Sequence, residues 1–262
     1  MRLPLVLLYH VIAPCPEDAD GEERGLFVDR RNFEQQMSDL AARGYRTLTL
    51  DEFACAADTG AVPARSFLLT FDDAYTQVDP VVSPVLRRHG FTAVMFAPSA
   101  HLGGNNTWDA DHRNLAMLQI AGEKQLTAMA AGPWEIASHG SRHVDLRGMD
   151  PQRRQDELVE ARERLSQLVR KPVVDFAYPY GFDDPGVRAD VRAAGYRMAF
   201  TMGPTTRAEP FHLPRRPIRG TDSLPIFRFK TSGWSDNLYR MGGAAPDWAR
   251  SLARGLLGAT AR

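Results

Sequence analysis

Short apolar runs alternate along the chain with longer segments of helical periodicity. The apolar runs are the expected strands, and they cover residues 3–8, 45–50, 66–71, 91–97, 134–138, 173–178 and 196–201. The helical segments cover residues 32–43, 78–89, 115–130, 151–169 and 184–194. Because the apolar runs are continuous rather than alternating, they are typical of parallel strands that helices cover.

Residues 151–169 form the clearest helical pattern. Pro151 suits the first helical turn, and Asp150 suits the N-cap position before it. The apolar residues recur at helical spacing and give this segment one apolar face: Leu158, Ala161, Leu165 and Leu168. We therefore expect a helix over the whole segment.

Repeated strand–helix units predict an α/β fold. A distorted (β/α) barrel of seven or eight parallel strands and an open doubly wound sheet both fit this order. We expect residues 1–220 to form the barrel and residues 221–262, which are basic and aromatic, to be an extension packed on it. Within the extension, a helix over residues 248–257 could pack on the barrel or touch a membrane surface.

The composition excludes one broad class of partner. The chain has 32 Lys and Arg against 32 Asp and Glu, so it has no overall positive field that would attract nucleic acid. Its cysteines, Cys15 and Cys55, lack the spacing of a metal site or a disulfide framework. The run at residues 3–8 is too short for a signal-peptide core, and no segment approaches the roughly 20 apolar residues of a membrane span, so we expect a cytoplasmic protein.

Two motifs place candidate metal ligands and acids directly after expected strands, where a parallel barrel carries its active site. In TFDDA, residues 70–74, the adjacent carboxylates of Asp72 and Asp73 can serve a metal and a proton separately, or can simply cap a helix. In HGSRH, His139 and His143 would lie on one side of a helical turn, about 6 Å apart along its axis, and can share an ion. Two imidazoles and one carboxylate leave room for water, as in catalytic metal sites.

A third motif, AYPYG at residues 177–181, follows another expected strand. Its turn can direct the backbone N–H of Tyr180 into the pocket, where it would stabilise an oxyanion. An ordinary strand-to-helix turn also explains the motif.

The three motifs together resemble those of the polysaccharide deacetylases, the carbohydrate esterase family built on the NodB homology domain. The resemblance extends from about Leu5 to Ile218. It implies a NodB-type barrel similar to a TIM barrel, and a hydrolase that removes an N-acetyl group from an amino sugar. The segment YHVI, residues 9–12, is similar to the YHxI segment of the poly-N-acetylglucosamine deacetylase subgroup.

The resemblance assigns the metal site and the base. Asp73, His139 and His143 would hold a divalent metal ion, most simply zinc, although cobalt or nickel also suits this donor set. Asp72 would be the general base that takes a proton from the metal-activated water. The N–H of Tyr180 would stabilise the oxyanion together with the metal.

The general acid is assigned less directly, because the late His usual in the family is absent. We favour His10, at the end of the first expected strand, on the likeness of its YHVI segment. His212 is the alternative acid. A third possibility is that His10 only holds the first strand in the core.

Three positions depart from the family pattern. Ala177 stands where the family has the Arg that restrains the base, so this cation must come from elsewhere. Arg215, at the end of a late strand, is our candidate, with a surface charge as the alternative. Ala74 replaces a turn Gly and Gly140 replaces a Ser or Thr, and both changes could alter the loops without removing a ligand.

The expected substrate is an N-acetylated sugar on a glycan, a lipid carrier or a glycosylated metabolite. Sugars stack on aromatic faces, and the candidates are Trp108, Trp134, Tyr178, Tyr180, Phe182 and Trp234. Two other functions stay open: a catalytically silent carbohydrate-binding domain, and a cyclic-amide hydrolase on the same barrel. The sequence makes no prediction of the oligomeric state.

Overall fold

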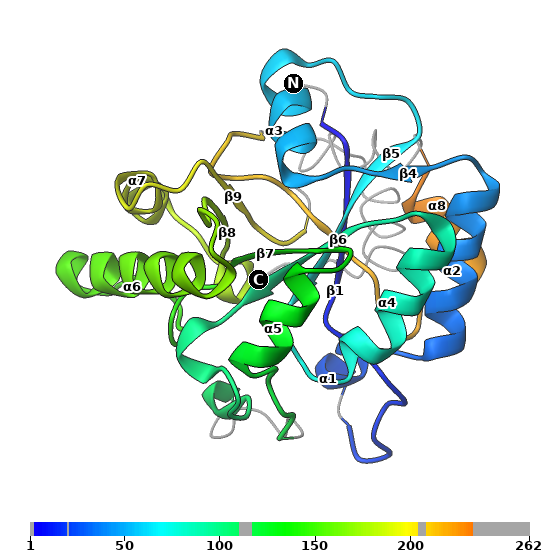
Figure 1. The fold of residues 1–262 in the computed structure, drawn as a ribbon, viewed down its shortest axis with the longest axis horizontal. Coiled ribbons are helices and arrows are strands. Elements are labelled where there is room, and N and C mark those ends of the chain that lie inside the picture. The colour runs from blue at the N-terminus through cyan, green and yellow to red at the C-terminus, as the bar shows by residue number, and fades with distance from the viewer. Residues whose placement is uncertain (1–2, 20, 110–116, 204–207, 233–262) are drawn as a thin grey trace, which may run out of the picture.

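A computed structural model describes residues 3–19, 21–109, 117–203 and 208–232 (Figure 1). Eight parallel strands form the main sheet in the order β10-β1-β5-β6-β7-β8-β9, with β4 paired to β5. The strands are β1 (Leu5–Tyr9), β4 (Arg46–Thr47), β5 (Ser66–Asp72), β6 (Ala93–Ala97), β7 (Trp134–Ser138), β8 (Asp175–Ala177), β9 (Met198–Phe200) and β10 (Arg216–Pro217). A second, two-stranded sheet pairs β2 (Val11–Ile12) with β3 (Phe27–Val28).

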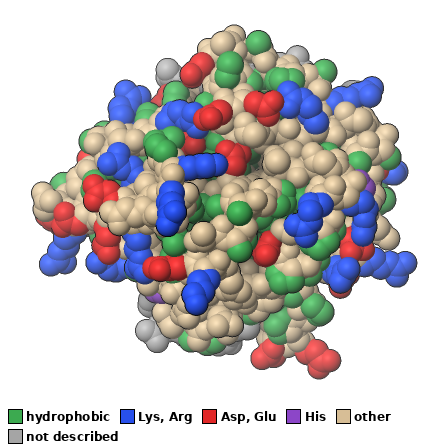
Figure 2. All heavy atoms as spheres, in the orientation of Figure 1, with side chains coloured by type: hydrophobic (Ala, Val, Ile, Leu, Met, Phe, Trp, Pro, Cys, Tyr) green, Lys and Arg blue, Asp and Glu red, His purple; other side chains and the backbone are tan. Residues whose placement is uncertain are grey.

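Helices surround the main sheet, with α6 and α7 beside β8 and β9, and α2, α4 and α8 gathered on the opposite side (Figure 1). They are α1 (Gly21–Leu26), α2 (Arg30–Ala42), α3 (Leu50–Thr59), α4 (Val78–His89), α5 (Glu123–Ala130), α6 (Pro151–Val169), α7 (Pro185–Ala193) and α8 (Leu224–Lys230). Three short 3₁₀ turns are η1 (Ser99–His101), η2 (Thr107–Asp109) and η3 (Pro179–Gly181). Figure 2 shows basic and acidic side chains intermixed over this face of the molecule.

The segment 213–217 joins the two edges of the sheet. Leu213 donates to Ala199 O of β9 at 3.0 Å and accepts from Thr201 N at 2.9 Å. A few residues further on, β10 pairs with β1. Because one stretch of chain is hydrogen-bonded to both edge strands, the sheet closes into the predicted barrel rather than staying open.

Alternate residues of each strand face the barrel interior, since side chains in a strand alternate between its two faces. In β5, Leu68 belongs to the interior apolar cluster, while Phe67 and Leu69 pack in the outer cluster beneath the helices. Asp72 lies two and four positions beyond Thr70 and Leu68, so the same alternation turns it inward at the end of the strand. The apolar interior therefore gives way to charge at the carboxyl ends of the strands.

Helix α3 covers the other end of the barrel and was not predicted. The strand expected over residues 45–50 ends at Thr47, and Thr49 then caps α3. Thr49 Oγ1 accepts from Glu52 N at 3.1 Å, and Glu52 accepts from Thr49 N at 3.0 Å. The apolar residues of α3 join the interior cluster: Leu50, Phe53 and Ala57.

Most other predicted elements are found within a few residues of their expected bounds, and α6 matches at both ends. The helix expected from residue 115 begins only at Glu123, because Gln119 and Ile120 form strand-like bridges to Asn105 and Tyr75. No helix in the described part of the chain is long and apolar enough to cross a membrane.

The first part of the predicted extension packs on helix α2. Phe227 of α8 is completely buried, and Arg228 Nε lies 2.7 Å from Asp39 Oδ1 of α2. Residues 233–262, and with them the helix predicted over residues 248–257, lie outside the described residues. The domain boundary at residue 220 stays a prediction.

Candidate active site

All the predicted site residues line one cavity of about 630 Å³ at the carboxyl ends of the strands: His10, Asp72, Asp73, His139, His143, Tyr180 and Arg215. They come from the ends of β1, β5, β7 and β8 and from the closing segment 213–217. Helix α1 supplies a further wall through Glu23 and Leu26, which sequence reasoning missed because this six-residue helix is too short to show a periodicity.

Asp72 is held by Arg215. The two guanidinium nitrogens of Arg215 donate to the two carboxylate oxygens at 2.6 and 2.7 Å, and Arg215 Nε donates to Thr201 O at 3.1 Å. Arg215 is only 1% exposed, so the alternative of a surface charge is wrong. Burial alone would raise the pKa of Asp72, but the charges of Arg215 and His139 outweigh it and lower the pKa, which keeps the carboxylate ionised.

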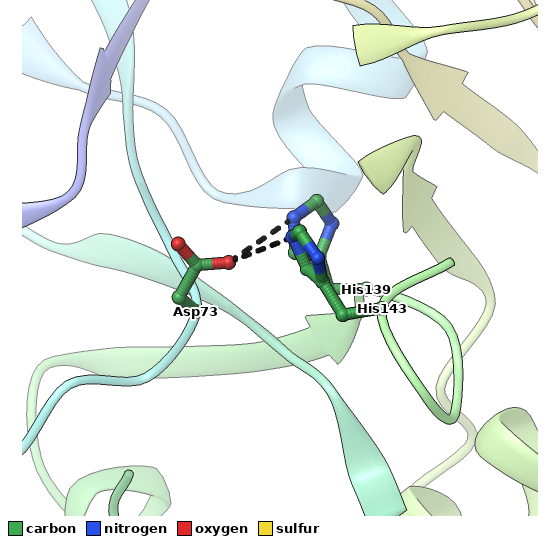
Figure 3. A group of neighbouring side chains, drawn as sticks. All are labelled: Asp73, His139 and His143. Carbon is green, nitrogen blue, oxygen red and sulfur yellow. Dashed lines mark ion pairs between the residues drawn. The ribbon is translucent and has the colours of Figure 1, made fainter. Parts of the chain in front are cut away.

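Asp73 points toward two imidazoles (Figure 3). Its Oδ1 lies 3.2 Å from His143 Nε2 and 3.4 Å from His139 Nε2. One potential ligand atom from each of the three residues lies within 4.8 Å of the others. His139 Nδ1 is 2.8 Å from Ala177 O, an arrangement in which Nδ1–H donates to the carbonyl and Nε2 presents its lone pair to Asp73 and the cavity.

These three residues fit a divalent cation. Within the described residues, the buried Asp73 Oδ1 and His143 Nδ1 have no hydrogen-bond partner, and an unpartnered carboxylate oxygen in the interior is costly unless a cation satisfies it. Burial lowers the pKa of His139 to about 4, although the charge of Asp72 opposes this. The pKa of Asp73 is lowered despite burial, mainly by the charge of His143. The carboxylate of Asp73 and the ring of His139 are therefore poised in the deprotonated forms that metals bind.

The backbone that carries the two imidazoles differs from the prediction. Residues 139–143 form an irregular loop and no helical turn, with φ of 78° at Gly140 and 54° at His143. The rings nevertheless come together, with centroids 4.9 Å apart. The left-handed residues reverse the chain so that His143 returns beside His139, and the expected helical spacing was the wrong reason for a correct proximity.

The turn after β5 is strained in the same way. Asp73 has a φ of 71°, and Ala74, where the family has Gly, has a φ of 58°. A left-handed conformation costs a residue with a side chain about 1–2 kcal/mol. The strain is held by surrounding contacts, among them a hydrogen bond from Ala121 N to Ala74 O at 2.8 Å. The missing turn Gly therefore leaves the predicted ligand Asp73 in the site.

The two candidate acids are separated by the structure. His10 lines the cavity directly after β1, close enough that its charge lowers the pKa of both Asp72 and Asp73. His212 does not line this cavity; its Nδ1 lies 2.9 Å from Asp183 and 3.1 Å from Arg188.

The aromatic candidates divide into cavity residues and core residues. The ring of Trp108 stacks on that of His143, with their centroids 4.3 Å apart. The ring of Tyr180, whose φ is 59°, packs edge-on against His143, with a centroid distance of 4.7 Å. Phe182 lines the cavity and is 39% exposed. Trp134 and Tyr178 are buried in the apolar clusters, and Trp234 lies outside the described residues.

Comparisons with known proteins agree with this geometry. The model of the family described as "Polysaccharide deacetylase" matches residues 59–199. The chain is 28% identical over 204 residues to YxkH of Bacillus subtilis, which is named as a polysaccharide deacetylase. It is 27% identical over 208 residues to the poly-beta-1,6-N-acetyl-D-glucosamine N-deacetylase of Staphylococcus epidermidis. The matched regions are 78% and 74% of this chain, and they span 65% and 68% of those two relatives.

The fold is shared with solved deacetylase structures. The deacetylase PplD of Streptococcus pyogenes, solved in complex with acetate, superposes with a TM-score of 0.73 at 22% identity, over 88% of this chain and 98% of that one. The structure of IcaB from Ammonifex degensii superposes with a TM-score of 0.70 at 23% identity, over 87% and 97%. With its family model matched over more than half of its length, the chain belongs to the polysaccharide deacetylase family.

Proposed function

We propose that the protein is a metal-dependent hydrolase that removes the N-acetyl group from an amino sugar. The observation that carries this proposal is the separation of two neighbouring carboxylates in one cavity. Asp73 faces two imidazoles with an unsatisfied oxygen, whereas Asp72 is held ionised by Arg215. Environments that differ in this way give neighbouring acids different roles, one as a ligand and one as a base.

A divalent metal held by Asp73, His139 and His143 would supply a Lewis acid that activates water and polarises the acyl oxygen. Asp72 lies beside this set, with its Oδ2 3.7 Å from His139 Nε2. Its ionised carboxylate can accept a proton from a water molecule at the site. Arg215 fixes the orientation of that carboxylate through both of its oxygens.

We assign the general acid to His10 and oxyanion stabilisation to the backbone N–H of Tyr180. His10 approaches the cavity from the end of β1, whereas Asp72 lies at the end of β5. The proposed acid and the proposed base are therefore carried by different strands. When the tetrahedral intermediate collapses, His10 would give a proton to the leaving amine. Because Tyr180 lies in the turn after β8, its amide is carried by a fixed backbone element of the cavity.

The lining of the cavity supports a sugar as substrate. Trp108, Tyr180 and Phe182 present aromatic surface around the metal set, and sugar rings stack on such surfaces. The Staphylococcus relative is named for a polymer of N-acetylglucosamine, which supports the same substrate class. We therefore propose an N-acetylglucosamine oligomer as the first substrate to test.

The test is acetate release from N-acetylglucosamine oligomers by the purified chain, stripped of metal and then loaded with zinc, cobalt or nickel. We expect release with at least one of these metals and its loss in Asp72→Asn. No release with any metal, together with glycan binding that His139→Ala leaves unchanged, would instead show a silent binding domain. A ring-opened product without acetate would show a cyclic-amide hydrolase.

A further inference from the structure

The loop that carries both imidazoles is held by a residue outside the three motifs. Glu157 of α6 accepts hydrogen bonds from two consecutive backbone amides of this loop, those of Ser141 and Arg142, at 2.7 and 2.5 Å. Its second oxygen accepts from Arg142 Nη1 at 2.7 Å. The carboxylate thus binds the loop where the chain reverses between His139 and His143.

Glu157 is itself 1% exposed, on the buried face of α6 with Leu158 and Ala161. A buried carboxylate is costly unless several donors surround it, and here two amides and one guanidinium do so. The opposite side of the loop is also bound, because Ser99 N and Ala100 N donate to the carbonyl oxygens of Gly140 and Ser141 at 3.0 and 2.8 Å. Glu157 therefore completes a clamp whose other half is the backbone of η1.

The two imidazoles depend on this clamp unequally. His139 has an anchor of its own, through Nδ1 and Ala177 O. His143 Nδ1 has no hydrogen-bond partner among the described residues, so no such bond orients its ring. The position of His143 consequently depends on the loop backbone, with its φ of 54°, on the rings of Trp108 and Tyr180, and on Asp73, whose Oδ1 lies 3.2 Å from its Nε2.

We propose that Glu157 is a positioning residue that sets the affinity of the site for a divalent metal by fixing the backbone that places His143. The proposal builds on the proposed function, because it takes the three-residue set to be a metal site. Glu157 itself is no ligand, since both of its oxygens are taken up by Ser141, Arg142 and the Arg142 side chain.

The experiment measures Zn²⁺ affinity by competition with a chromophoric chelator, and the absorption spectrum of the Co²⁺-loaded protein, with no substrate present. Loss of a side chain that orients a metal ligand typically lowers metal affinity about 10–100-fold, and we expect this for Glu157→Ala. Glu157→Gln keeps an oxygen that can accept both amides and should stay within about fivefold of the wild type, so it is the conservative rescue.

Glu160 offers a matched control on the same helix. Its Oε2 also pairs with Arg142, at 3.4 Å, but its side chain is 47% exposed and it accepts from no loop amide in the described structure. We expect Glu160→Ala to leave both the Zn²⁺ affinity and the Co²⁺ spectrum unchanged. Should Glu157→Ala fail to fold, Glu157→Asp keeps the charge but shortens the reach, and we expect about a tenfold loss of affinity.

A double-mutant cycle separates positioning from general damage to the fold. In a His143→Ala background, Glu157→Ala should have almost no further effect on affinity, because the ligand through which it acts is gone. A folded Glu157→Ala or Glu157→Asp protein that binds Zn²⁺ as tightly as the wild type overturns the positioning role alone. A wild type that binds no divalent metal overturns the proposed function instead.

Discussion

The two ends of the barrel interior are closed in different ways. At the amino ends of the strands, α3 closes the interior with Leu50, Phe53 and Ala57, and its first turn is satisfied by its own capping box. At the carboxyl ends, the same interior terminates in the buried charges of Asp72 and Arg215. The amino end is therefore closed by a helix, whereas the carboxyl end opens into the cavity.

The carboxyl end also concentrates buried polar atoms without a hydrogen-bond partner and residues with a strained backbone. Within the described residues, buried side-chain atoms without a hydrogen-bond partner occur there on Asp73, Ser141 and His143. Left-handed φ values occur there at four residues with side chains: Asp73, Ala74, His143 and Tyr180. Such features lower stability and persist where the surrounding structure enforces them, as at binding sites. The comparison teaches that one end of the core is closed by apolar packing, whereas the other end carries the candidate site.

The largest effect we expect is on catalysis, from Asp72→Asn at the carboxyl end. Removing a general acid or base typically lowers kcat by about 10²–10⁴-fold. The amide oxygen of Asn can still accept from Arg215, and the metal set is untouched, so metal content should equal that of the wild type. Acetate release and metal analysis on the same preparation check this. A loss of less than about tenfold would remove Asp72 from the role of base.

At the amino end, Phe53→Ala should reduce stability without affecting the site. Phe53 is fully buried against Phe200, and truncating a buried Phe to Ala typically costs about 3–5 kcal/mol. Urea unfolding measures the loss, and Zn²⁺ titration of the folded variant should match the wild type. A selective loss of metal affinity would show that the two ends are coupled and would break the comparison.

In the metal-free protein, stability should fall as the pH is lowered from about 6.5 to 4. The pKa of His139 is lowered to about 4 by burial from an ordinary 6.5, so in this window the unfolded chain binds a proton that the folded chain does not. The loss is on the order of 3 kcal/mol. The pKa values of Asp72 and Asp73 are lowered, so their contribution is lost only at still lower pH.

Urea unfolding of the metal-free protein at pH 7 and pH 5 measures this dependence. His139→Gln has no titrating group at this position, so its stability should fall less between pH 7 and pH 5 than that of the wild type; burial also lowers the pKa of His89 and of His101, and these two residues keep their contribution in the variant. Equal slopes for the variant and the wild type would mean that the site is not the source of the pH dependence.

His10 and His212 should respond differently to the same substitution. We expect His10→Gln to lower kcat about 100-fold, as loss of a general acid does. We expect His212→Gln to leave kcat within about threefold, because its ring contacts Asp183 and Arg188 outside the cavity. Acetate release by the two variants compares them directly, and the reverse order would reassign the acid to His212.

The smallest effect we expect comes from Phe182→Ala, at the rim of the cavity. Its exposed ring is covered on one face by Arg147, whose guanidinium carbon lies 4.0 Å from the ring centroid. Stacking on one aromatic ring contributes on the order of 1 kcal/mol, so KM for an oligomer should rise several-fold with kcat unchanged. Met117→Ala, an exposed residue that does not line the cavity, is the control. A fall in kcat instead would place Phe182 at the reacting group.

The fold was largely predictable because its strands are short apolar runs and its helices have clear periodicity. Among the helices that were missed, α1 is too short to show a periodicity, whereas α3 had a signal that the apolar run at residues 45–50 concealed. Thr49 and Glu52 have the spacing of a capping box, which marks the start of a helix. The apolar run suits a strand as far as Leu50, but the capping box starts the helix with Thr49 as its N-cap, so the strand ends before it, at Thr47.

The site was predictable where its residues lie together in a motif. The pairing of Asp72 with Arg215 joins residues 143 positions apart, and only the resemblance suggested it. Glu157 gave no signal at all, because a Glu in a helix is normally exposed, and its burial follows from the packing of α6 against the loop at residues 139–143. Contacts of this kind arise from tertiary structure and leave no trace in local spacing.

The segment 213–217, which joins the two edges of the sheet, also carries the guanidinium that orients Asp72. During synthesis, before residues 213–217 have left the ribosome, the chain already has every carboxylate and imidazole of the three motifs. Its sheet is still open, however, and Asp72 lacks Arg215. Closure of the sheet and orientation of the Asp72 carboxylate therefore depend on the same segment. The candidate site is therefore complete only when β10, the last strand in the described residues, pairs with β1.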